Sequence, residues 1–407
     1  MTYPHQSKFL QQLGVKSYIN AQNWSTKIGG TYLEPEVLEA MDDVAHAFVD
    51  MRELMDKACR RVAELCKVEA AYITTGAAAG IVLCTAACIA GDDPRKWKAL
   101  PFSDDPPIRG RNRILIQAGH VTYPEQYAGG GGRLVAVGDA YGCTPAEMEE
   151  AITEQTAGIA AGYHYNVIPR GWVPYPTLTE IAGKHDLPSF CDAAGALPPY
   201  ANLHRMNEFG FDLVTFSGGK GIRGPQNTGL ILARGERGKR LLRLIQEQSS
   251  PNMGMGRAFK VSKECIAGLV AALELVMRRD EQQEFDRQLA KAEYMTKELE
   301  GIPGVSVSVV PNDGDTYEHP LMAHVPNVRI DLDKKALKLD TVNRVYTAMQ
   351  DGEPGIFIRF PRFEDREFGP FTSRASVFLF TFFLRDGEEE LVARKMREVL
   401  TKKPWST

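Results

Sequence analysis

The chain has 407 residues, of which 43% are hydrophobic and 25% charged, a composition typical of a soluble globular protein large enough for two domains. Its formal net charge of −4 provides no overall attraction for nucleic acid or for an anionic membrane. No apolar run approaches the ~20 residues needed to cross a bilayer. We therefore expect a small-molecule substrate, and neither a nucleic acid nor a membrane as a partner.

The seven cysteines are scattered without C-x-x-C spacing, and Cys84, Cys88 and Cys191 lie inside apolar runs. This pattern indicates reduced thiols rather than a disulfide framework. The first residues also lack the charged start and apolar stretch of a signal peptide. We therefore expect a cytoplasmic protein.

Alternating strand and helix patterns begin after an N-terminal arm. Residues 1–33 have the pattern of an extended arm, and Pro35 predicts the start of a helix that runs to about Lys67 with a break near Asp50. The apolar runs that follow are separated by helical patterns, which predicts an α/β fold with a large, doubly wound, mostly parallel seven-stranded sheet. The predicted strands are Ala70–Thr74, Arg113–Gln117, Leu134–Val137, Gly158–Tyr163, Pro188–Cys191, Asp212–Phe216 and Gly229–Ala233.

The pattern changes in the C-terminal third. Residues 262–300 read as one long helix, after which shorter strands and helices predict a smaller α+β domain. The predicted division is an arm and helix start over residues 1–50, a large domain over 51–262, and the linking helix with the small domain over 263–407.

The most informative stretch is Phe216-Ser-Gly-Gly-Lys220, which follows one strand-like run and precedes another. Lys220 is flanked by three glycines, and no acidic residue lies within four positions on either side. A single lysine is more often a solvated surface residue, but a desolvated lysine has a lowered pKa and can attack an aldehyde. This context favours a lysine that forms a Schiff base.

Asp192 ends another apolar run, 28 residues before Lys220. An aspartate at a strand end can also be an ordinary turn or cap residue. Here Ala194 leaves room for a flat ring nearby, and ligands bind at the carboxyl edge of such sheets. A lysine and a carboxylate at that edge are what pyridoxal phosphate (PLP) needs, because the carboxylate keeps the pyridine nitrogen protonated.

A phosphate site is predicted where the first strand turns into a helix. Gly76, Ala77 and Ala78 would present backbone N–H groups at the positive end of the helix dipole. Small residues at a helix start are also common packing devices, so this signal is weak alone. Together with Ser217, Lys220 and Asp192 it completes a set of residues for binding PLP.

Histidines and arginines supply further candidates. His120 follows a strand and could stack on the cofactor or act as an acid or base, although a capped turn histidine fits the spacing equally well. His164 and Asn166 are weaker candidates of the same kind. Arginine suits bidentate binding of a carboxylate, and a surface role is the alternative. The arginine candidates for substrate binding are Arg223, Arg359 and Arg385.

Taken together, these residues resemble the selenocysteine synthase-like branch of fold-type I PLP enzymes, in particular its D-glucosaminate-6-phosphate ammonia-lyase-like members. The resemblance covers nearly the whole chain from about Tyr18, and its most specific part is Phe216-Ser-Gly-Gly-Lys220 with Gly224-Pro-Gln226. It implies the fold-type I architecture, Lys220 as the Schiff-base lysine, Asp192 as the partner of the pyridine nitrogen and His120 at the ring-stacking position. It also implies a homodimer or a higher homo-oligomer.

Two departures from this family bear on the substrate. Selenocysteine synthase carries an N-terminal tRNA-binding domain, whereas only 19 residues precede Asn20 here, so we do not expect a tRNA-linked substrate. Asn23 stands where the family leads us to expect glycine, and it is followed by Trp24. This pair narrows the predicted substrate side of the site, which argues against a sugar-acid phosphate without indicating a replacement.

The leading functional hypothesis is a PLP-dependent lyase of the α,β-elimination type, that is, an ammonia-lyase or dehydratase. Its substrate would be a small or medium amino acid, with an amino sugar acid as one candidate, and Lys220 would take the α-proton. Racemase, aldolase and aminotransferase reactions remain open, because the fold does not fix the reaction. A non-catalytic protein of the same fold is a second class, against which the intact Lys220 and Asp192 argue. We expect no metal site.

Overall fold

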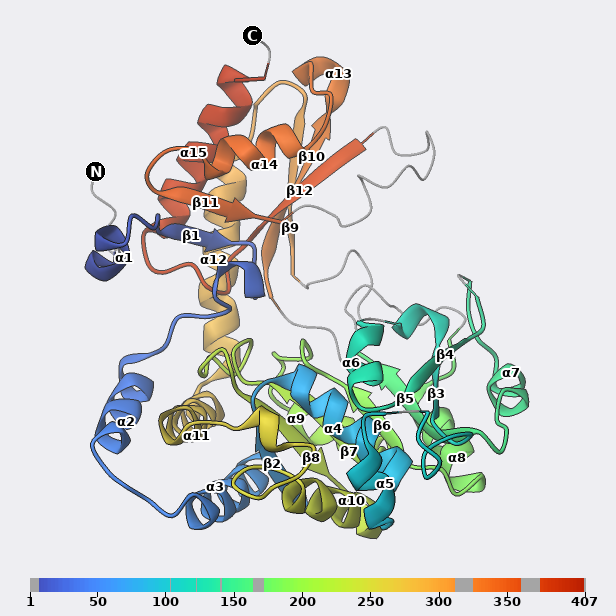
Figure 1. The fold of residues 1–407 in the computed structure, drawn as a ribbon. Helices are drawn as coiled ribbons and strands as arrows, with labels where there is room; N and C mark the ends of the chain where they lie inside the picture. The colour runs from blue at the N-terminus through green and yellow to red at the C-terminus, as the bar shows by residue number, and fades with distance from the viewer. Residues whose placement is uncertain are drawn as a thin grey trace. The chain divides into compact units, whose positions relative to one another are not determined.

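The computed structural model describes residues 7–102, 104–121, 123–139, 141–163, 172–311, 325–359 and 374–405 (Figure 1). They form two compact units, a larger one over Gly29–Arg279 and a smaller one that combines the residues up to Ile28 with those from Asp280 onward. The predicted boundaries lay at residues 50 and 262. Residues 29–50 and 263–279 join the larger unit because helix α2 (Pro35–Ala45) packs against helix α11 (Lys263–Arg278).

The larger unit is built on a seven-stranded sheet in the order β2-β8-β7-β6-β5-β3-β4. β8 is antiparallel to both neighbours, and the remaining pairs are parallel, so six strands run in one direction. The prediction of a large, mostly parallel seven-stranded sheet is therefore confirmed. The strands are β2 (Ala70–Thr74), β3 (Arg113–Gln117), β4 (Arg133–Val137), β5 (Thr156–Gly162), β6 (Ser189–Asp192), β7 (Leu213–Ser217) and β8 (Gly229–Ala233).

Helix α4 (Ala77–Ala90) is the central helix of this unit and is buried along nearly its whole length. Its alanines and Gly80 let it approach the sheet closely, and it packs on β7 and β8 as well as on helices α6 and α10. Seven of the other helices of this unit are α3 (Met51–Cys66), α5 (Pro94–Ala99), α6 (Pro124–Gly129), α7 (Pro145–Glu150), α8 (Tyr175–Lys184), α9 (Asn202–Glu208) and α10 (Gly235–Glu247).

Capping residues fix where several helices begin and end. The predicted break near Asp50 is confirmed, because its carboxylate accepts hydrogen bonds from the N–H groups of Arg52 and Glu53 at the start of α3. The prediction of one long helix over residues 262–300 is wrong. It is divided into α11 and α12 (Glu281–Leu299), because Asp280 caps the second helix and Arg279 before it is extended.

The smaller unit has its own core and two sheets. β1 (Tyr18–Ala21) pairs in parallel with β11 (Gly355–Ile358), so the predicted extended arm of residues 1–33 is in part a strand of this unit. The second sheet is antiparallel, in the order β12-β10-β9. Its strands are β9 (Val305–Val310), β10 (Asn327–Asp333) and β12 (Arg374–Phe380), and the helices of the unit are α1 (Lys8–Gln12), α12, α13 (Lys334–Leu337), α14 (Asn343–Gln350) and α15 (Glu388–Lys402). The predicted small α+β domain is confirmed.

All seven cysteines are free thiols, and all but Cys265 are buried. In the part of the chain that the structure describes, no helix is both long and apolar enough to span a membrane.

Candidate active site

The carboxyl edge of the seven-stranded sheet collects most of the predicted cofactor residues. In the register of the sheet, Thr74 at the end of β2 lies opposite Gly229, which lies opposite Ser217 at the end of β7. Asp192 at the end of β6 pairs with Thr215 on one side and with Gly162 on the other. Neighbouring strands are about 4.8 Å apart, so Ser217 lies about one strand spacing from Asp192, and Thr74 about three.

The loop that carries Lys220 is folded tightly on itself. The Gly218 N–H donates to the Thr228 carbonyl at 2.8 Å, and the Gly224 N–H donates to the Gly218 carbonyl at 2.8 Å. Gly219, beside the lysine, has no space for a side chain, because a Cβ there would lie 2.4 Å from both the Cα and the Oε1 of Gln226. The glycines therefore serve the packing of the loop, and they leave Lys220 half-buried at the sheet edge.

The start of α4 has the features of a phosphate site. Gly76 precedes the helix with φ +111°, a conformation suited to glycine, and no side chain caps the helix among the described residues. The first helical bond runs from the Gly80 N–H to the Gly76 carbonyl, so the preceding amides lack acceptors within the helix. A Cβ on Gly229 would lie 2.6 Å from the nitrogen of Ala77, so the absence of a side chain there keeps this turn against β8.

Asp192 is a buried carboxylate at the end of β6. It is 7% exposed, and one oxygen accepts a hydrogen bond from the Ala194 N–H at 3.0 Å. Within the described residues it forms no ion pair. Burial raises the pKa of Tyr175, and the negative charge of Asp192 contributes to that rise. Isolated buried charges are costly, so a protonated ring nitrogen is the kind of partner that this carboxylate fits.

His120 is held at the same edge by contacts that the sequence did not reveal. It is 4% exposed, and its Nδ1 accepts a hydrogen bond from the Gly162 N–H at 3.4 Å. Its ring centroid lies 6.0 Å from that of Trp172 and 6.0 Å from that of Tyr175. A neutral ring that accepts at Nδ1 carries its proton at Nε2.

Gln117 fixes the segment that packs on His120. Its amide nitrogen donates to the Val173 carbonyl at 2.9 Å, and its amide oxygen accepts from the Val173 N–H at 2.6 Å. The one signal of this contact in the sequence is Gln117 itself, a polar residue at the end of an apolar strand. His164 and Asn166, the weaker candidates, lie outside the described residues.

Arg223 has a protein partner in the larger unit. It is buried in a left-handed conformation, and its Nη1 lies 3.3 Å from a carboxylate oxygen of Glu34. Arg279 contacts the same oxygen at 2.8 Å. The role of Arg223 in substrate binding stays a prediction. Its ion pair with Glu34 gives it a structural role in addition.

The smaller unit contains four of the predicted substrate residues, and three of them, Asn23, Trp24 and Arg359, follow the paired ends of β1 and β11. β1 and β11 are parallel and end together, with Ala21 opposite Ile358, so Asn23 and Arg359 both follow that edge. The Trp24 ring meets the Phe382 ring edge-on at 5.5 Å, and the Arg359 guanidinium lies over the Phe380 ring at 5.1 Å. Arg385 lies at the start of α15, where its N–H donates to the Glu388 carboxylate at 2.8 Å.

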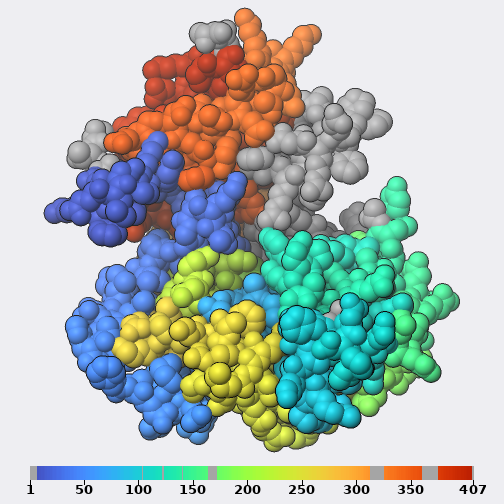
Figure 2. Space-filling view, in the orientation of Figure 1, coloured from blue at the N-terminus to red at the C-terminus, as the bar shows by residue number. Residues whose placement is uncertain are grey.

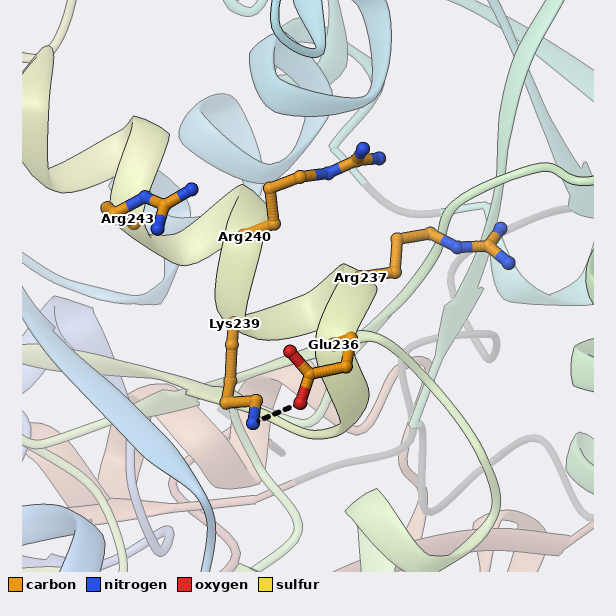
Figure 3. Close-up of a pocket in the computed structure, with 5 residues that line it drawn as sticks. All are labelled: Glu236, Arg237, Lys239, Arg240 and Arg243. Atoms are coloured by element: carbon orange, nitrogen blue, oxygen red, sulfur yellow. Dashed lines mark ion pairs between the residues drawn. The ribbon is translucent and has the colours of Figure 1, made fainter.

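A separate pocket of ≈ 520 Å³ is lined by charged residues of α10 and lies elsewhere in the larger unit (Figure 3). α10 follows the end of β8, which pairs with the starting ends of β2 and β7, so the pocket belongs to the opposite edge of the sheet. Arg237, Arg240 and Arg243 project to one side of the helix, and Lys239 pairs with Glu236 at 2.5 Å. Arg240 pairs with Asp92 at 3.1 Å, so part of this charge is already neutralised. No cluster of metal-binding residues occurs among the described residues.

A half-buried lysine, a buried carboxylate that forms no ion pair among the described residues and a helix start without a side-chain cap, all at one sheet edge, fit the needs of a fold-type I PLP-dependent enzyme. A family model for class-V aminotransferases matches residues 131–340. A 5'-C-glycyluridine monooxygenase-decarboxylase from Streptomyces sp is 34% identical over 310 residues, which cover 74% of each chain. The chain belongs to this class-V aminotransferase family, whose members are PLP-dependent.

The ammonia lyases of this family are similar along most of the chain. The D-glucosaminate-6-phosphate ammonia lyase of Salmonella typhimurium is 32% identical over 269 residues, covering 65% of this chain and 69% of that protein. A solved structure of D-glucosaminate-6-phosphate ammonia-lyase superposes with a TM-score of 0.77 at 25% identity, covering 97% of this chain and 98% of the other. The predicted family, cofactor and class of PLP-dependent lyase are thereby confirmed.

Proposed function

We propose that this enzyme eliminates the β-hydroxyl group from an α-amino acid with a polyhydroxylated, sugar-like side chain. Loss of water, followed by hydrolysis of the resulting imine, which takes up one water, would give ammonia and an α-keto acid as the net products. When bound, PLP withdraws electrons from the α-carbon of an amino acid and so makes its α-proton acidic. The observation that carries the proposal is the buried Asp192 carboxylate, which lies at the same sheet edge as Lys220 and forms no ion pair among the described residues.

Each residue at the carboxyl edge of the seven-stranded sheet has a separate role in this proposal. The Lys220 amine would hold the cofactor and then carry the α-proton. The Asp192 carboxylate would hold the proton on the pyridine nitrogen, and the amides at the start of α4 would hold the phosphate. Ser217 and Ala194 would flank the cofactor, and the His120 ring would cover its face.

The substrate class follows from what the relatives are named for. Glucosaminate and glycyluridine are both α-amino acids that carry a hydroxyl on the β-carbon and a hydroxylated sugar-like group beyond it. The Arg359 guanidinium would bind the α-carboxylate, with Arg385 as the alternative. The net charge of −4 and the absence of a basic character favour a free metabolite over a tRNA-linked one.

The similarity to the monooxygenase-decarboxylase supports a second candidate. That reaction also begins with an activated α-carbon but consumes dioxygen and releases carbon dioxide. The two candidates differ in the co-reactant, so oxygen uptake separates them.

The test is a turnover screen of the PLP-loaded enzyme. D-Glucosaminate, its 6-phosphate, 5'-C-glycyluridine, L-serine and L-threonine would be supplied with and without oxygen, and keto acid, ammonia, oxygen and carbon dioxide measured. We expect keto acid and ammonia in equal amounts from a hydroxylated substrate, without oxygen uptake. Oxygen-dependent release of carbon dioxide would establish the second candidate. Racemisation, aldol cleavage or amino transfer as the main reaction would overturn the proposed elimination.

We also propose that the enzyme is a homo-oligomer whose subunits meet at an exposed apolar face. Phe48 and Met253 are fully or largely exposed, at 105% and 84%. The Arg52 guanidinium donates to the Asn252 side chain at 3.1 Å, which holds the two segments together. Figure 2 shows the yellow segment around residue 250 beside the blue segment around residue 50. Exposed apolar patches of this kind mark interfaces, and a second copy of this chain is the occupant that the family resemblance implies.

Light scattering after size-exclusion chromatography tests this assembly. We expect at least a dimer for the wild type and dissociation by Phe48→Asp, whereas Phe102→Asp, a change of another exposed phenylalanine, leaves the mass unchanged. A monomeric wild type at micromolar concentration contradicts the proposal.

The seven free thiols support a reducing compartment such as the cytoplasm, which cell fractionation can test.

A further inference from the structure

Asn23 is a buried amide that the fold does not use. It follows β1 in the smaller unit with φ +78°, the left-handed region that asparagine tolerates better than most residues. Its side chain is 1% exposed, yet neither the Nδ2 nor the Oδ1 atom has a hydrogen-bond partner in the described structure. Buried polar groups in proteins are nearly always satisfied, so an amide with both ends unsatisfied calls for a partner from outside the chain.

The Oε1 atom of the neighbouring Gln22 is also buried without a hydrogen-bond partner in the described structure, but Asn23 differs in lacking a partner at both ends of its amide, and the fold uses Asn20 and Trp24 on either side. The Asn20 side-chain oxygen accepts a hydrogen bond from the Gln22 N–H at 3.0 Å, which closes a turn at the end of β1. On the other side, the Trp24 ring packs on Phe382. The fold thus employs one asparagine and the tryptophan of this segment and leaves the second asparagine amide available.

The chemistry of an amide limits what can satisfy it. Nδ2 only donates and Oδ1 only accepts, so a ligand must offer both an acceptor and a donor. A phosphate or carboxylate offers acceptors alone and leaves Oδ1 unsatisfied in a buried place. A hydroxyl group both donates and accepts, and a pair of neighbouring hydroxyls can satisfy both ends.

The position of Asn23 points to the substrate as that ligand. Asn23 and Arg359 follow paired strand ends, Ala21 and Ile358, at one edge of the small sheet. Arg359 is the residue proposed to bind the α-carboxylate, so a hydroxylated side chain of the same molecule is the expected neighbour of the amide.

We infer that Asn23 is a specificity-determining residue that hydrogen-bonds neutral hydroxyl groups of the substrate side chain and so selects a hydroxylated group over a phosphorylated one. This inference rests on the proposed function. The competing explanation is a structural asparagine whose amide supports the backbone turn through bound water.

Two substitutions of neighbouring asparagines separate these explanations in the PLP-loaded enzyme. Asn23→Gly suits the left-handed backbone and removes only the amide, and Asn20→Gly removes an amide that the fold uses. We expect the melting temperature of Asn23→Gly to equal or exceed that of the wild type, and that of Asn20→Gly to fall. A fall for Asn23→Gly comparable to that for Asn20→Gly overturns the inference.

Substrate selectivity supplies the second readout. We compare kcat/KM for D-glucosaminate with that for its 6-phosphate and for L-serine, and use 5'-C-glycyluridine to distinguish sugar hydroxyls from a nucleobase. A site built to bind hydroxyls discriminates strongly, so we expect Asn23→Gly to lower the ratio of D-glucosaminate to L-serine by about tenfold or more. Asn23→Asp, which keeps the size but loses the donor, should lower activity on the 6-phosphate most.

The possible outcomes distinguish a failure of the inference about Asn23 from a failure of the proposed function. A wild type that turns over the panel, with unchanged ratios in Asn23→Gly, overturns the role of Asn23 and leaves the proposed function standing. A wild type that converts none of the hydroxylated amino acids overturns the proposed function and, with it, the assignment of the ligand to Asn23. A retained melting temperature with a collapsed ratio supports the inference.

Discussion

The carboxyl edge of the seven-stranded sheet holds Asp192 and His120 through hydrogen bonds of the fold, whereas the end of the β1–β11 pair is followed by Asn23, whose amide the fold does not use. Asp192 accepts from Ala194 and His120 accepts from Gly162, so both are fixed before any ligand arrives. Asn23 at the other place has no such bond in the described structure. The groups proposed to hold the cofactor are preorganised, whereas the Asn23 amide, which is proposed to select the substrate, would gain its hydrogen bonds only when the substrate binds.

The largest effect that this comparison predicts is at Lys220. Lys220→Ala should bind PLP only reversibly and lose at least about 10²–10⁴-fold in kcat, because both the covalent attachment and the proton carrier are gone. The wild type should be yellow, and borohydride should fix the cofactor on the peptide that contains residue 220. Lys184→Ala, a change of a surface lysine paired with Glu149, serves as the control and should be fully active. Cofactor fixed on another lysine contradicts the assignment of the site.

Asp192→Asn should retain PLP and lose most activity. The amide cannot hold the proton on the pyridine nitrogen, and each pKa unit lost there corresponds to ~1.4 kcal/mol, or about tenfold, between the two protonation states. Asp212→Asn is a matched control, because Asp212 is also a partly buried aspartate but binds the Ser189 N–H at the opposite end of β6. The measurement is kcat per bound cofactor. Equal activity of Asp192→Asn and wild type would mean that another residue holds the ring nitrogen.

Trp24→Ala tests the other region and should act on stability. The ring meets Phe382 edge-on and is half-buried, so we expect a loss of about 1–3 kcal/mol in the free energy of unfolding of the smaller unit. Thermal unfolding should show this loss, while the ratios of kcat/KM among substrates stay fixed. A changed substrate preference at unchanged stability would instead place the indole in the substrate site, as the sequence had suggested.

The sequence predicted that Lys220, Asp192 and Gly76 lie at one sheet edge but not how the segment around Asn23 is arranged, and the reason is physical. Lys220, Asp192 and Gly76 follow apolar strands, and parallel strands bring their carboxyl ends to one edge whatever the details of packing. The parallel pairing of β1 with β11 joins segments more than three hundred positions apart, and no local pattern in residues 1–33 indicates it. Trp172 and Tyr175 lie on His120 only because Gln117 binds the backbone of Val173, which is likewise a long-range contact.

The break between α11 and α12 is marked in the sequence by the N-cap residue Asp280, but the helix-favouring residues around it conceal this signal. Asp280 is an ordinary N-cap residue followed by glutamate and two glutamines, yet the surrounding residues all favour helix, and the amphipathic pattern continues across it. Composition alone therefore predicts continuity, whereas the capping hydrogen bonds to Gln282 and Gln283 create a new helix start.

The smallest expected effect concerns the thiols, all of which lie in the larger unit. Burial raises the pKa of Cys59 and of Cys66 to about 12, so these thiols remain protonated and unreactive at pH 8 in the folded protein. Iodoacetamide should first modify Cys265, the one cysteine that is not buried, with little change in activity. Trp24→Ala weakens only the smaller unit and should leave the labelling rates of the buried thiols unchanged, as followed by mass spectrometry. Faster labelling of Cys59 or Cys66 in that variant would contradict a loss of stability that is confined to the smaller unit.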